Sequence, residues 1–518
     1  MSNKFYITTP IYYPNAEPHL GHVYTTICAD VLARFHRLVG DETFLLTGTD
    51  EHGVKMVRTA AEKGVEPCQL ADRVSGVFKS LWQELDITHD DFIRTSSPRH
   101  HKCVQSIISR LLANEDIYLG AYEGWYDEGQ EEFVTETEAR TRDYIAFNGK
   151  PLAQFSEPSY FFRLTKYADR LLDFLNSHPE FILPQERFNE VVSKLKAGVQ
   201  DLSISRATLK WGIPFPNDPE HVVYVWIDAL SNYISALDYG TDNDARFRQF
   251  WPADLHLIGK EILWFHAVYW PCILLSLGEP LPRQIFAHGW WLSGGRKMSK
   301  TEGNFIGIEK LREAVGAYGM DTLRYYLLRT ASFGNDLNWF DAELARSFTE
   351  LSNTIGNCLN RVLKMVFKYR GGVLPTREPD ALLLPVDYAL MNQTQALFPA
   401  LQAAYAACQL HQCALLPVEL ARSINVYIEA AAPFKLARDP AKAGRLDTVL
   451  NITTQGIYTA MAGLLPVLPH KAIEGLSQLS VQANGRKLEQ LALPLADGHV
   501  LTEGTPLFQR STTGYNLP

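Results

Sequence analysis

Residues Thr8–His22 read "TTPIYYPNAEPHLGH" and join a β-branched, aromatic run to a segment with helical periodicity. The run begins at "KFYITT", which predicts a short buried strand. After Pro18, apolar residues recur every fourth position from Val23 and Ile27 onward, which predicts a helix that ends at Gly40. A second strand, "ETFLLTG", follows. Strand, helix and strand in this order predict a parallel, doubly wound sheet.

The same stretch places two histidines at the expected start of the helix. Pro18 suits the first helical position, and His19 and His22 are three residues apart, so they share one face there. A helix N-terminus favours phosphate, because it presents unpaired N–H groups and the positive end of the dipole. Gly21 leaves room for a ligand ring against the backbone. Taken alone, the motif more often marks two histidines that only cap a helix.

A second motif is a glycine-rich, cationic loop, "GGRKMSKTEGN", at Gly294–Asn304. Lys297 and Lys300 are compact point charges on flexible stems, which suits them to stabilise negative charge that grows during a reaction. A solvated basic loop without function would look similar. The combination of this loop with an H-x-G-H motif after the first strand is much rarer than either alone.

Length and composition favour a multidomain protein of the cytoplasm. A chain of 518 residues exceeds one hydrophobic core, since domains hold roughly 100–200 residues. Seven cysteines without framework spacing indicate reduced thiols, and the sequence has no secretory or transit pattern. No apolar run reaches the ~20 residues of a membrane helix. The net charge of −9 argues only weakly against a nucleic-acid partner, because a local basic face can bind phosphates.

Changes in composition and periodicity along the chain predict an interrupted sheet followed by helices. The segment after Leu119 is acidic, aromatic and rich in turn residues, which predicts a small α+β insertion in which helical signals return at "SYFFRLTKYADRLLDFL". A second α/β stretch begins near Val222, and "LHLIG" passes into an apolar helix from Glu261. Strand signals fade beyond about Glu350, which predicts an all-α C-terminal domain. The expected limits are 1–116 and 222–290 for the two halves of the sheet domain, 117–221 for the insertion, 291–350 for the region of the cationic loop, and 351–518 for the helices.

These motifs resemble those of class I aminoacyl-tRNA synthetases, with "HLGH" and "KMSKT" as the two signatures. The signatures alone leave several amino-acid specificities open, as well as small HxGH nucleotidyltransferases. Three further stretches are similar to the methionyl-tRNA synthetases: "TTPIYYPNAEPHLGH", "TGTDEHG" and "YVWIDALSNY". "DLSISR", "WGIPFP" and "HGWWLSGGRKMSKTEGN" fit the same family. The resemblance covers most of residues 4–345 and extends more loosely through the helical part.

The resemblance implies a Rossmann-type catalytic domain that joins a carboxylate to the α-phosphate of ATP. Positioning and charge stabilisation carry such a reaction. His19, His22, Lys297 and Lys300 are the implied catalytic residues. The implied ATP-binding residues are His19, Gly21, His22, Gly259, Glu261, Lys297 and Lys300. Mg²⁺ is expected as a phosphate counter-ion, held mostly by substrate and water.

The resemblance also implies an apolar pocket for L-methionine, with selectivity from shape and from contacts between sulfur and aromatic rings. Asp50 would hold the substrate ammonium, and Ile11 would contribute its backbone carbonyl. Ile262, His266 and Trp270 are spaced by four residues and are expected on one helix face. A stripe of this kind is more often part of a hydrophobic core. The implied pocket residues are Ile11, Tyr13, Asp50, Trp226, Ala229, Leu230, Tyr233, Ile262, His266 and Trp270.

The insertion departs from the family in one respect. Many relatives carry a zinc knuckle with cysteine ligands, whereas this chain has Tyr126 followed by Asp127, Glu128, Gly129 and Gln130. Carboxylates alone here suit a solvated turn, so no structural zinc and no other metal held by protein ligands is expected. Packing around Trp125, Tyr126 and Phe133 is expected to hold the insertion instead.

The resemblance assigns the helical domain to the anticodon of tRNA(Met), both initiator and elongator. Unstacked RNA bases are recognised by stacking and by hydrogen bonds to their edges. Asn357 and Arg361 lie four apart on one expected helix face, and Pro433 and Phe434 match family positions in a second stretch. Relatives often have tryptophan where this chain has Phe434. Individually, each of the four could equally be structural.

Two alternative interpretations stay open at this point. A class I ligase for leucine or valine commonly needs a large editing insertion, and one for cysteine needs zinc ligands, and the chain shows neither. A non-catalytic RNA-binding paralogue would typically lose His19, His22 or Lys300, and all three are present. The chain ends soon after Arg510 without the dimer-forming domain of some relatives, so a monomer is expected.

Overall fold

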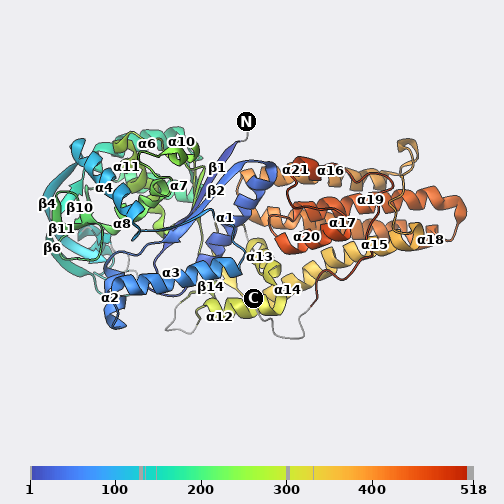
Figure 1. Ribbon diagram of the computed structural model, residues 1–518, viewed down its shortest axis with the longest axis horizontal. Helices are drawn as coiled ribbons and strands as arrows, with labels where there is room; N and C mark the ends of the chain where they lie inside the picture. Colours follow the sequence, from blue (N-terminus) through green and yellow to red (C-terminus); the bar gives the residue numbers. More distant parts are fainter. Residues whose placement is uncertain are drawn as a thin grey trace. The chain divides into compact units, whose positions relative to one another are not determined.

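The computed structural model describes residues 3–127, 132–134, 136–146, 149–298, 304–330 and 332–509. The chain divides into two compact units, each drawn in Figure 1. The sheet unit comprises Lys4–Ala29 and Thr43–Gly289. The helical unit comprises Met1–Asn3, Asp30–Glu42 and Trp290–Pro518.

A parallel six-stranded sheet forms the centre of the sheet unit, as the sequence predicts. Ile7 lies opposite Leu255 and Thr8 opposite His256, so the first strand pairs with one about 250 residues later. The order of the strands is β3-β2-β1-β12-β13-β7. Their bounds are Lys4–Tyr12 for β1, Glu42–Thr49 for β2, Asp91–Arg94 for β3, Ile182–Leu183 for β7, Leu255–Gly259 for β12 and Ile285–His288 for β13.

The first helix, α1, spans Leu20–Val39 and ends at Gly40, whose φ of 102° is left-handed. The expected end is therefore confirmed, but the expected start is wrong. Pro18 and His19 precede the helix instead of forming its first turn. The helix begins only after the loop at Pro14–His19 has turned the chain back from β1.

Helices cover the sheet and supply its core. α3 (Pro67–Glu84) buries Trp82, and α4 (Pro98–Ala113) buries a row of aliphatic side chains. The other helices of this unit are α2 (Val54–Glu62), α5 (Glu136–Thr141), α6 (Thr165–Ser177), α7 (Gln185–Lys196), α8 (Val225–Leu230), α9 (Asn232–Ser235), α10 (Ala245–Phe250) and α11 (Trp270–Leu277). The unit thus has helices on both sides of a buried parallel sheet.

A second sheet lies within residues 117–221, with the order β5-β4-β6-β8. The helix expected from "SYFFRLTKYADRLLDFL" starts later than predicted, because its aromatic residues end strand β6, where Phe162 pairs with Ile117 and Leu202. Strand β7 also comes from this range but joins the central sheet. The bounds are Ile117–Asp127 for β4, Glu132–Val134 for β5, Ala153–Phe162 for β6 and Leu202–Ser203 for β8.

The insertion has a small core of its own, at Val134, Ala139, Ala146 and Leu152. Trp125 packs against this core, and Tyr126 is buried. The side chain of Phe133 and residues 128–131 lie outside the described parts, so the expected packing at Phe133 stays a prediction. A three-stranded sheet, β10-β11-β9, follows; its strands are Pro214–Phe215, Asp218–Val223 and Ser205–Arg206.

The segment after β12 differs from the single helix expected from Glu261. It consists of a 3₁₀ turn (η1, Lys260–Ile262), a π-helical turn (η2, Phe265–Tyr269) and then α11. Ile262, His266 and Trp270 therefore do not share the face of one regular α-helix. Pro271 has no N–H to donate to the carbonyl one α-helical turn earlier, which favours the wider turn.

The helical unit contains one small sheet and a bundle, and the expected all-α C-terminal region is confirmed (Figure 1). The sheet has the order β15-β14-β16, with strands Arg296–Lys297, Trp291–Ser293 and Leu337–Trp339. In the bundle, α16, α17 and α19 pack on one another and α15 packs on α19. The helices are α12 (Ile308–Tyr318), α13 (Met320–Arg329), α14 (Asp341–Leu351), η3 (Ser352–Gly356), α15 (Asn357–Arg370), η4 (Asp380–Leu382), α16 (Pro385–Ala406), α17 (Leu410–Ala431), α18 (Pro433–Leu436), η5 (Pro440–Lys442), α19 (Ala443–Gly463), α20 (Pro469–Gln478) and α21 (Leu488–Leu491).

The stretch "LARSINVYIEAAAPFKLARD" does not form one continuous helix. α17 ends at Ala431, Ala432 adopts a left-handed φ of 43°, and α18 restarts at Pro433. A proline is well suited to the first position of the new helix. Among the helices that the structure describes, none combines the length and apolar character needed to cross a bilayer.

Candidate active site

The loop between β1 and α1 brings the two motif histidines together. The rings of His19 and His22 stack with their centroids 3.8 Å apart. The backbone N–H of Gly21 donates to Nδ1 of His19 at 3.0 Å, and the backbone N–H of His19 donates to Nδ1 of His22 at 3.3 Å. A Cβ on Gly21 would lie 2.9 Å from the His19 ring, so a larger residue would displace that ring.

These hydrogen bonds define the protonation of both rings. An Nδ1 that accepts a backbone N–H carries no proton, so each neutral ring carries its proton on Nε2. Burial, together with the neighbouring His19, lowers the pKa of His22 well below its usual value. Each imidazole therefore keeps an Nε2–H that can donate to a phosphate oxygen.

A third histidine, His288 at the end of β13, also reaches α1. Its Nε2 lies 2.7 Å from Oγ1 of Thr25, and its Nδ1 lies 2.8 Å from the carbonyl of Gly289. Because a carbonyl only accepts, Nδ1 carries the proton. Nε2 faces the hydroxyl of Thr25, which also lies 3.0 Å from the carbonyl of Gly21. Burial lowers the pKa of His288, which keeps this ring neutral. The sequence motifs did not point to this residue, since its partner is 263 positions away.

The end of β12 provides the next predicted contacts. Gly259 is the last residue of the strand, and Glu261 lies in the 3₁₀ turn that follows. A Cβ on Gly259 would lie 2.6 Å from the carboxylate oxygens of Glu261. The glycine therefore lets that carboxylate fold back over the strand end. This is the carboxyl edge of the parallel sheet, where ligands bind in folds of this class.

The predicted amino-acid pocket centres on a buried aromatic cluster. The hydroxyl of Tyr233 lies 2.7 Å from Nε2 of His266, whose Nδ1 lies 2.9 Å from the carbonyl of Ile262. The carbonyl fixes the proton on Nδ1, so Tyr233 donates to Nε2. Burial lowers the pKa of His266 to about 4. His266 is thus held neutral between two partners.

Further pocket candidates lie in the same core. The rings of Trp226 and Phe265 stack 3.6 Å apart, and Trp270 is fully buried. Nε1 of Trp270 donates to Nε2 of His256, a buried histidine that the sequence reasoning missed. Ala229 and Leu230, at the end of α8, are buried as well. Their burial alone fits core packing as well as a pocket, so their contact with methionine stays a prediction.

The polar end of the predicted pocket forms where β1 and β2 end side by side. The backbone N–H of Asp50 donates to the carbonyl of Tyr12 at 2.9 Å, which places Asp50 beside Ile11 and Tyr13. Asp50 is almost fully buried, whereas Ile11 and Tyr13 are half-buried. Lys55 lies 4.5 Å from the centre of the Tyr13 ring.

Glu51, next to Asp50, was not predicted and is the centre of a buried ion pair. Its carboxylate accepts from Nε and Nη2 of Arg94 at 2.6 and 3.0 Å. It also accepts from Ser75 at 2.6 Å, and Ser96 donates to it. Burial alone would raise the pKa of Glu51, but these donors outweigh it and the pKa is lowered. The loop that carries Asp50 is therefore tied firmly to the end of β3.

The cationic loop belongs to the helical unit. β14 and β15 form a hairpin through Gly294 and Gly295, both with left-handed φ, and Lys297 pairs with Leu292. The amide side chain of Asn338, on β16, accepts the backbone N–H of Gly295 at 2.9 Å. Residues 299–303, which include Lys300, and the side chain of Lys297 lie outside the described parts. Their catalytic roles stay predictions.

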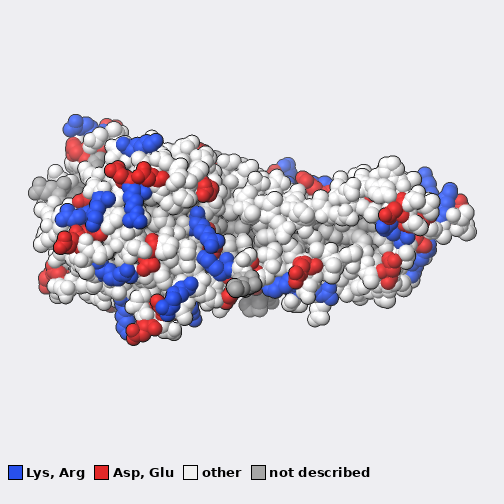
Figure 2. Space-filling view, turned by 90° about the horizontal axis from the view of Figure 1, so that it is seen from above, with Lys and Arg blue, Asp and Glu red and all other residues white. Residues whose placement is uncertain are grey.

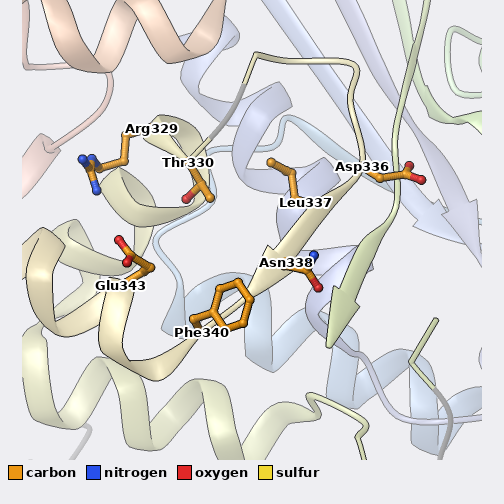
Figure 3. Close-up of a pocket in the computed structure, with 7 residues that line it drawn as sticks. All are labelled: Arg329, Thr330, Asp336, Leu337, Asn338, Phe340 and Glu343. Atoms are coloured by element: carbon orange, nitrogen blue, oxygen red, sulfur yellow. The ribbon is translucent and has the colours of Figure 1, made fainter. Parts of the chain in front are cut away.

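Beside this hairpin the helical unit has an open cavity of about 390 Å³ (Figure 3). Strand β16 and the residue after it form one wall, and the ends of α13 and α14 supply charged side chains. The lining residues are Arg329, Thr330, Asp336, Leu337, Asn338, Phe340 and Glu343. Of the predicted site residues whose side chains the structure describes, none lines this cavity.

Comparison with known proteins identifies the family. The family described as "tRNA synthetases class I (M)" matches residues 5–142 and 144–363. The methionine–tRNA ligase of Listeria monocytogenes is 42% identical over 98% of this chain and 78% of its own length. That of Rickettsia conorii is 42% identical over 98% of both chains.

The chain belongs to the class I methionyl-tRNA synthetase family. A solved structure of Mycobacterium tuberculosis methionyl-tRNA synthetase in complex with methionyl-adenylate superposes with a TM-score of 0.93. It is 39% identical and covers 98% of this chain and all of its own. The apo form of the same enzyme gives a TM-score of 0.86. The Rossmann-type fold inferred from the sequence is thereby confirmed.

The residues that family resemblance assigns to the anticodon lie near one another in the helical unit. Nη1 of Arg361, on α15, forms an ion pair with Glu429 of α17 at 2.6 Å. Asn357 precedes it by one turn, at the start of α15. At the start of α18, Pro433 is buried whereas Phe434 is 48% exposed. On the face shown in Figure 2, the end of this unit that carries α18 mixes basic and acidic side chains.

No group of three or more His, Cys, Asp and Glu side chains among the described residues is arranged to hold a metal ion. The turn where relatives carry zinc ligands follows Tyr126, and beyond Asp127 its residues 128–130 lie outside the described parts. The expectation of a zinc-free insertion therefore stays a prediction.

Proposed function

We propose that the chain is a methionine–tRNA ligase. It activates L-methionine with ATP to methionyl-adenylate, releases pyrophosphate, and transfers the methionyl group to the 3′ end of tRNA(Met), both initiator and elongator. The observation that carries the proposal is 39% identity, along 98% of the chain, to a synthetase solved with methionyl-adenylate. The paired neutral imidazoles at the start of α1 supply the phosphate contacts that the first step needs.

In the formation of methionyl-adenylate, the main task of the protein is to position ATP and methionine. His19 and His22 donate through Nε2 to the phosphates of ATP, and Asp50 holds the methionine ammonium at the neighbouring strand end. The methionine carboxylate then attacks the α-phosphorus and displaces pyrophosphate. Lys297 and Lys300 stabilise the charge on the transferring phosphate and on the leaving group. Mg²⁺ accompanies the ATP phosphates and offsets part of their charge.

Amino-acid-dependent exchange of pyrophosphate into ATP tests the first half-reaction. The full-length protein should catalyse exchange with methionine and much less with leucine, valine or cysteine. A pocket of this kind separates substrates that differ by one methylene by only about 1–3 kcal/mol, so homocysteine, which is one carbon shorter than methionine, is the sharpest competitor. Exchange that requires a different amino acid would overturn the specificity.

The anticodon assignment has a separate test at Arg361. Arg361→Ala should lower charging of tRNA(Met) while ATP–pyrophosphate exchange with methionine stays at the wild-type rate. Arg422→Ala is the matched control, because Arg422 also pairs with a glutamate on the surface of the helical unit. An equal loss of charging in both variants, or a loss of exchange in Arg361→Ala, would contradict the assignment.

The proposal also includes the metal content, location, oligomeric state and domain limits that were inferred from the sequence. The insertion is zinc-free, the enzyme is a cytoplasmic monomer, and the domains follow the limits 1–116, 117–221, 222–290, 291–350 and 351–518. Stoichiometric zinc by elemental analysis would contradict the first. A dimer mass by light scattering at micromolar concentration would contradict the second.

A further inference from the structure

The sheet unit contains a buried carboxylate that is not among the residues assigned to ATP or methionine. Asp228, on α8, is completely buried. Its Oδ2 lies 2.6 Å from Nδ1 of His52, and its Oδ1 lies 2.7 Å from Nε2 of His100. An ionised carboxylate only accepts hydrogen bonds, so both imidazoles donate to it.

The surroundings hold this carboxylate in its charged form. Burial alone would raise the pKa of Asp228, but the two histidines outweigh it and lower the pKa to about 2. Nδ1 of His100 lies in turn 2.7 Å from the hydroxyl of Ser235, on α9. Four side chains from four segments thus form one hydrogen-bonded cluster. A charge with two charge-assisted hydrogen bonds is a strong and directional joint in a dry site.

One arm of the cluster reaches the loop that carries Asp50. His52 is two residues beyond Asp50, in the turn after β2. Other contacts hold this loop as well: the carbonyl of Tyr12 accepts the N–H of Asp50, Arg94 binds the carboxylate of Glu51, and Trp211 donates to the carbonyl of Glu51 at 2.6 Å. The contact at His52 differs from these because it ties the loop to α8.

The other arm belongs to α8, the helix that carries three of the predicted methionine contacts. Trp226 precedes Asp228 by two residues, and Ala229 and Leu230 follow it directly. The carboxylate of Asp228 therefore joins the polar end of the predicted pocket to its apolar wall, through His52.

We propose that Asp228 is a positioning residue for the methionine site, which holds the Asp50 loop and helix α8 at a fixed separation. The inference rests on the proposed function, because it needs Asp50, Trp226 and their neighbours to bind methionine. Asp228 acts through His52 and does not touch the substrate. Loss of the joint widens the range of positions that Asp50 samples, so methionine binds more weakly while the ATP contacts at His19 and His22 persist.

Asp228→Asn in the full-length protein tests the proposal by ATP–pyrophosphate exchange. The KM for methionine should rise about tenfold or more, the size expected for loss of one charge-assisted hydrogen bond. The KM for ATP should change less than about twofold. Asp116→Asn is the matched control: Asp116 is equally buried in the sheet unit and accepts from Ser276 at 2.6 Å, with Lys166 at 2.5 Å. It should lower thermal stability without changing the KM for methionine.

Two further variants keep the test decisive if Asp228→Asn unfolds. His100→Gln leaves the His52–Asp228 contact in place, so it should raise the KM for methionine by a smaller factor. His52→Gln breaks the arm to the loop and should match Asp228→Asn. An unchanged KM for methionine in a folded Asp228→Asn or His52→Gln protein overturns the proposal. Absence of methionine-dependent exchange in the wild-type protein overturns the proposed function instead.

Discussion

His266 is expected to make the sheet unit sensitive to acid. Its ring is buried and accepts from Tyr233 at Nε2 while Nδ1 donates to Ile262, so a second proton would lose the tyrosine contact. Burial lowers its pKa from 6.5 to about 4. The unfolded chain therefore binds more protons than the folded one between these values. The stability that the neutral ring contributes is complete above pH 6.5 and is lost as the pH falls toward 4.

The size of the effect follows from the two pKa values. At pH 5, a group with a pKa of 6.5 unfolded and about 4 folded lowers the free energy of unfolding by about 2 kcal/mol relative to pH 7. Other buried histidines with lowered pKa values, such as His22 and His256, act in the same direction. The contribution of His266 is therefore the difference between wild type and a variant that cannot titrate there.

His266→Gln provides that variant, since its amide can donate and accept but does not ionise. Urea unfolding at pH 7 and pH 5 is followed by tryptophan fluorescence, because most of the tryptophans lie in the sheet unit. Between the two pH values, wild type should lose about 2 kcal/mol more than His266→Gln. His178→Gln, which removes an exposed histidine of the same unit, should lose as much as wild type. Equal losses in wild type and His266→Gln would refute the assignment of a neutral, buried imidazole.

Three further outcomes are expected. Tyr13→Ala should raise the KM for methionine more than that for ATP, whereas His22→Gln should chiefly slow adenylate formation; single-turnover kinetics with the opposite pattern would contradict this division of the first loop. Arg324→Met removes a fully buried guanidinium bound to an aspartate and two carbonyls, and should cost the helical unit about 3–5 kcal/mol by urea unfolding followed by circular dichroism; a cost under about 1 kcal/mol would contradict it. Asn338→Ala loses the hydrogen bond to Gly295 and should lower kcat for exchange severalfold, whereas Asn338→Asp keeps the acceptor and should recover most of it; equal rates in the two variants would contradict a role for this contact.

Much of the fold could be predicted from local patterns. Hydrophobic periodicity, with glycine and proline at element boundaries, predicts three features: a strand followed by a helix at β1 and α1, the end of α1 at Gly40, and the helical C-terminal region. The π-helical turn at Phe265–Tyr269 could not be predicted, because the apolar pattern around it is compatible with an ordinary α-helix. The edge strand β7 was missed for a related reason: two residues give no periodic signal.

The candidate site also has features that the sequence predicts and features that only the tertiary structure decides. The sequence determined which chemical groups are present, and the spacing of His19 and His22 already indicated that the two rings would meet. It did not determine that Asp228 lies between His52 and His100, which are 176 and 128 positions away. Those contacts exist only after the strands, α4 and α8 have packed. Charge, tautomer and pKa depend on burial and on partners distant in sequence, so only the tertiary structure decides them.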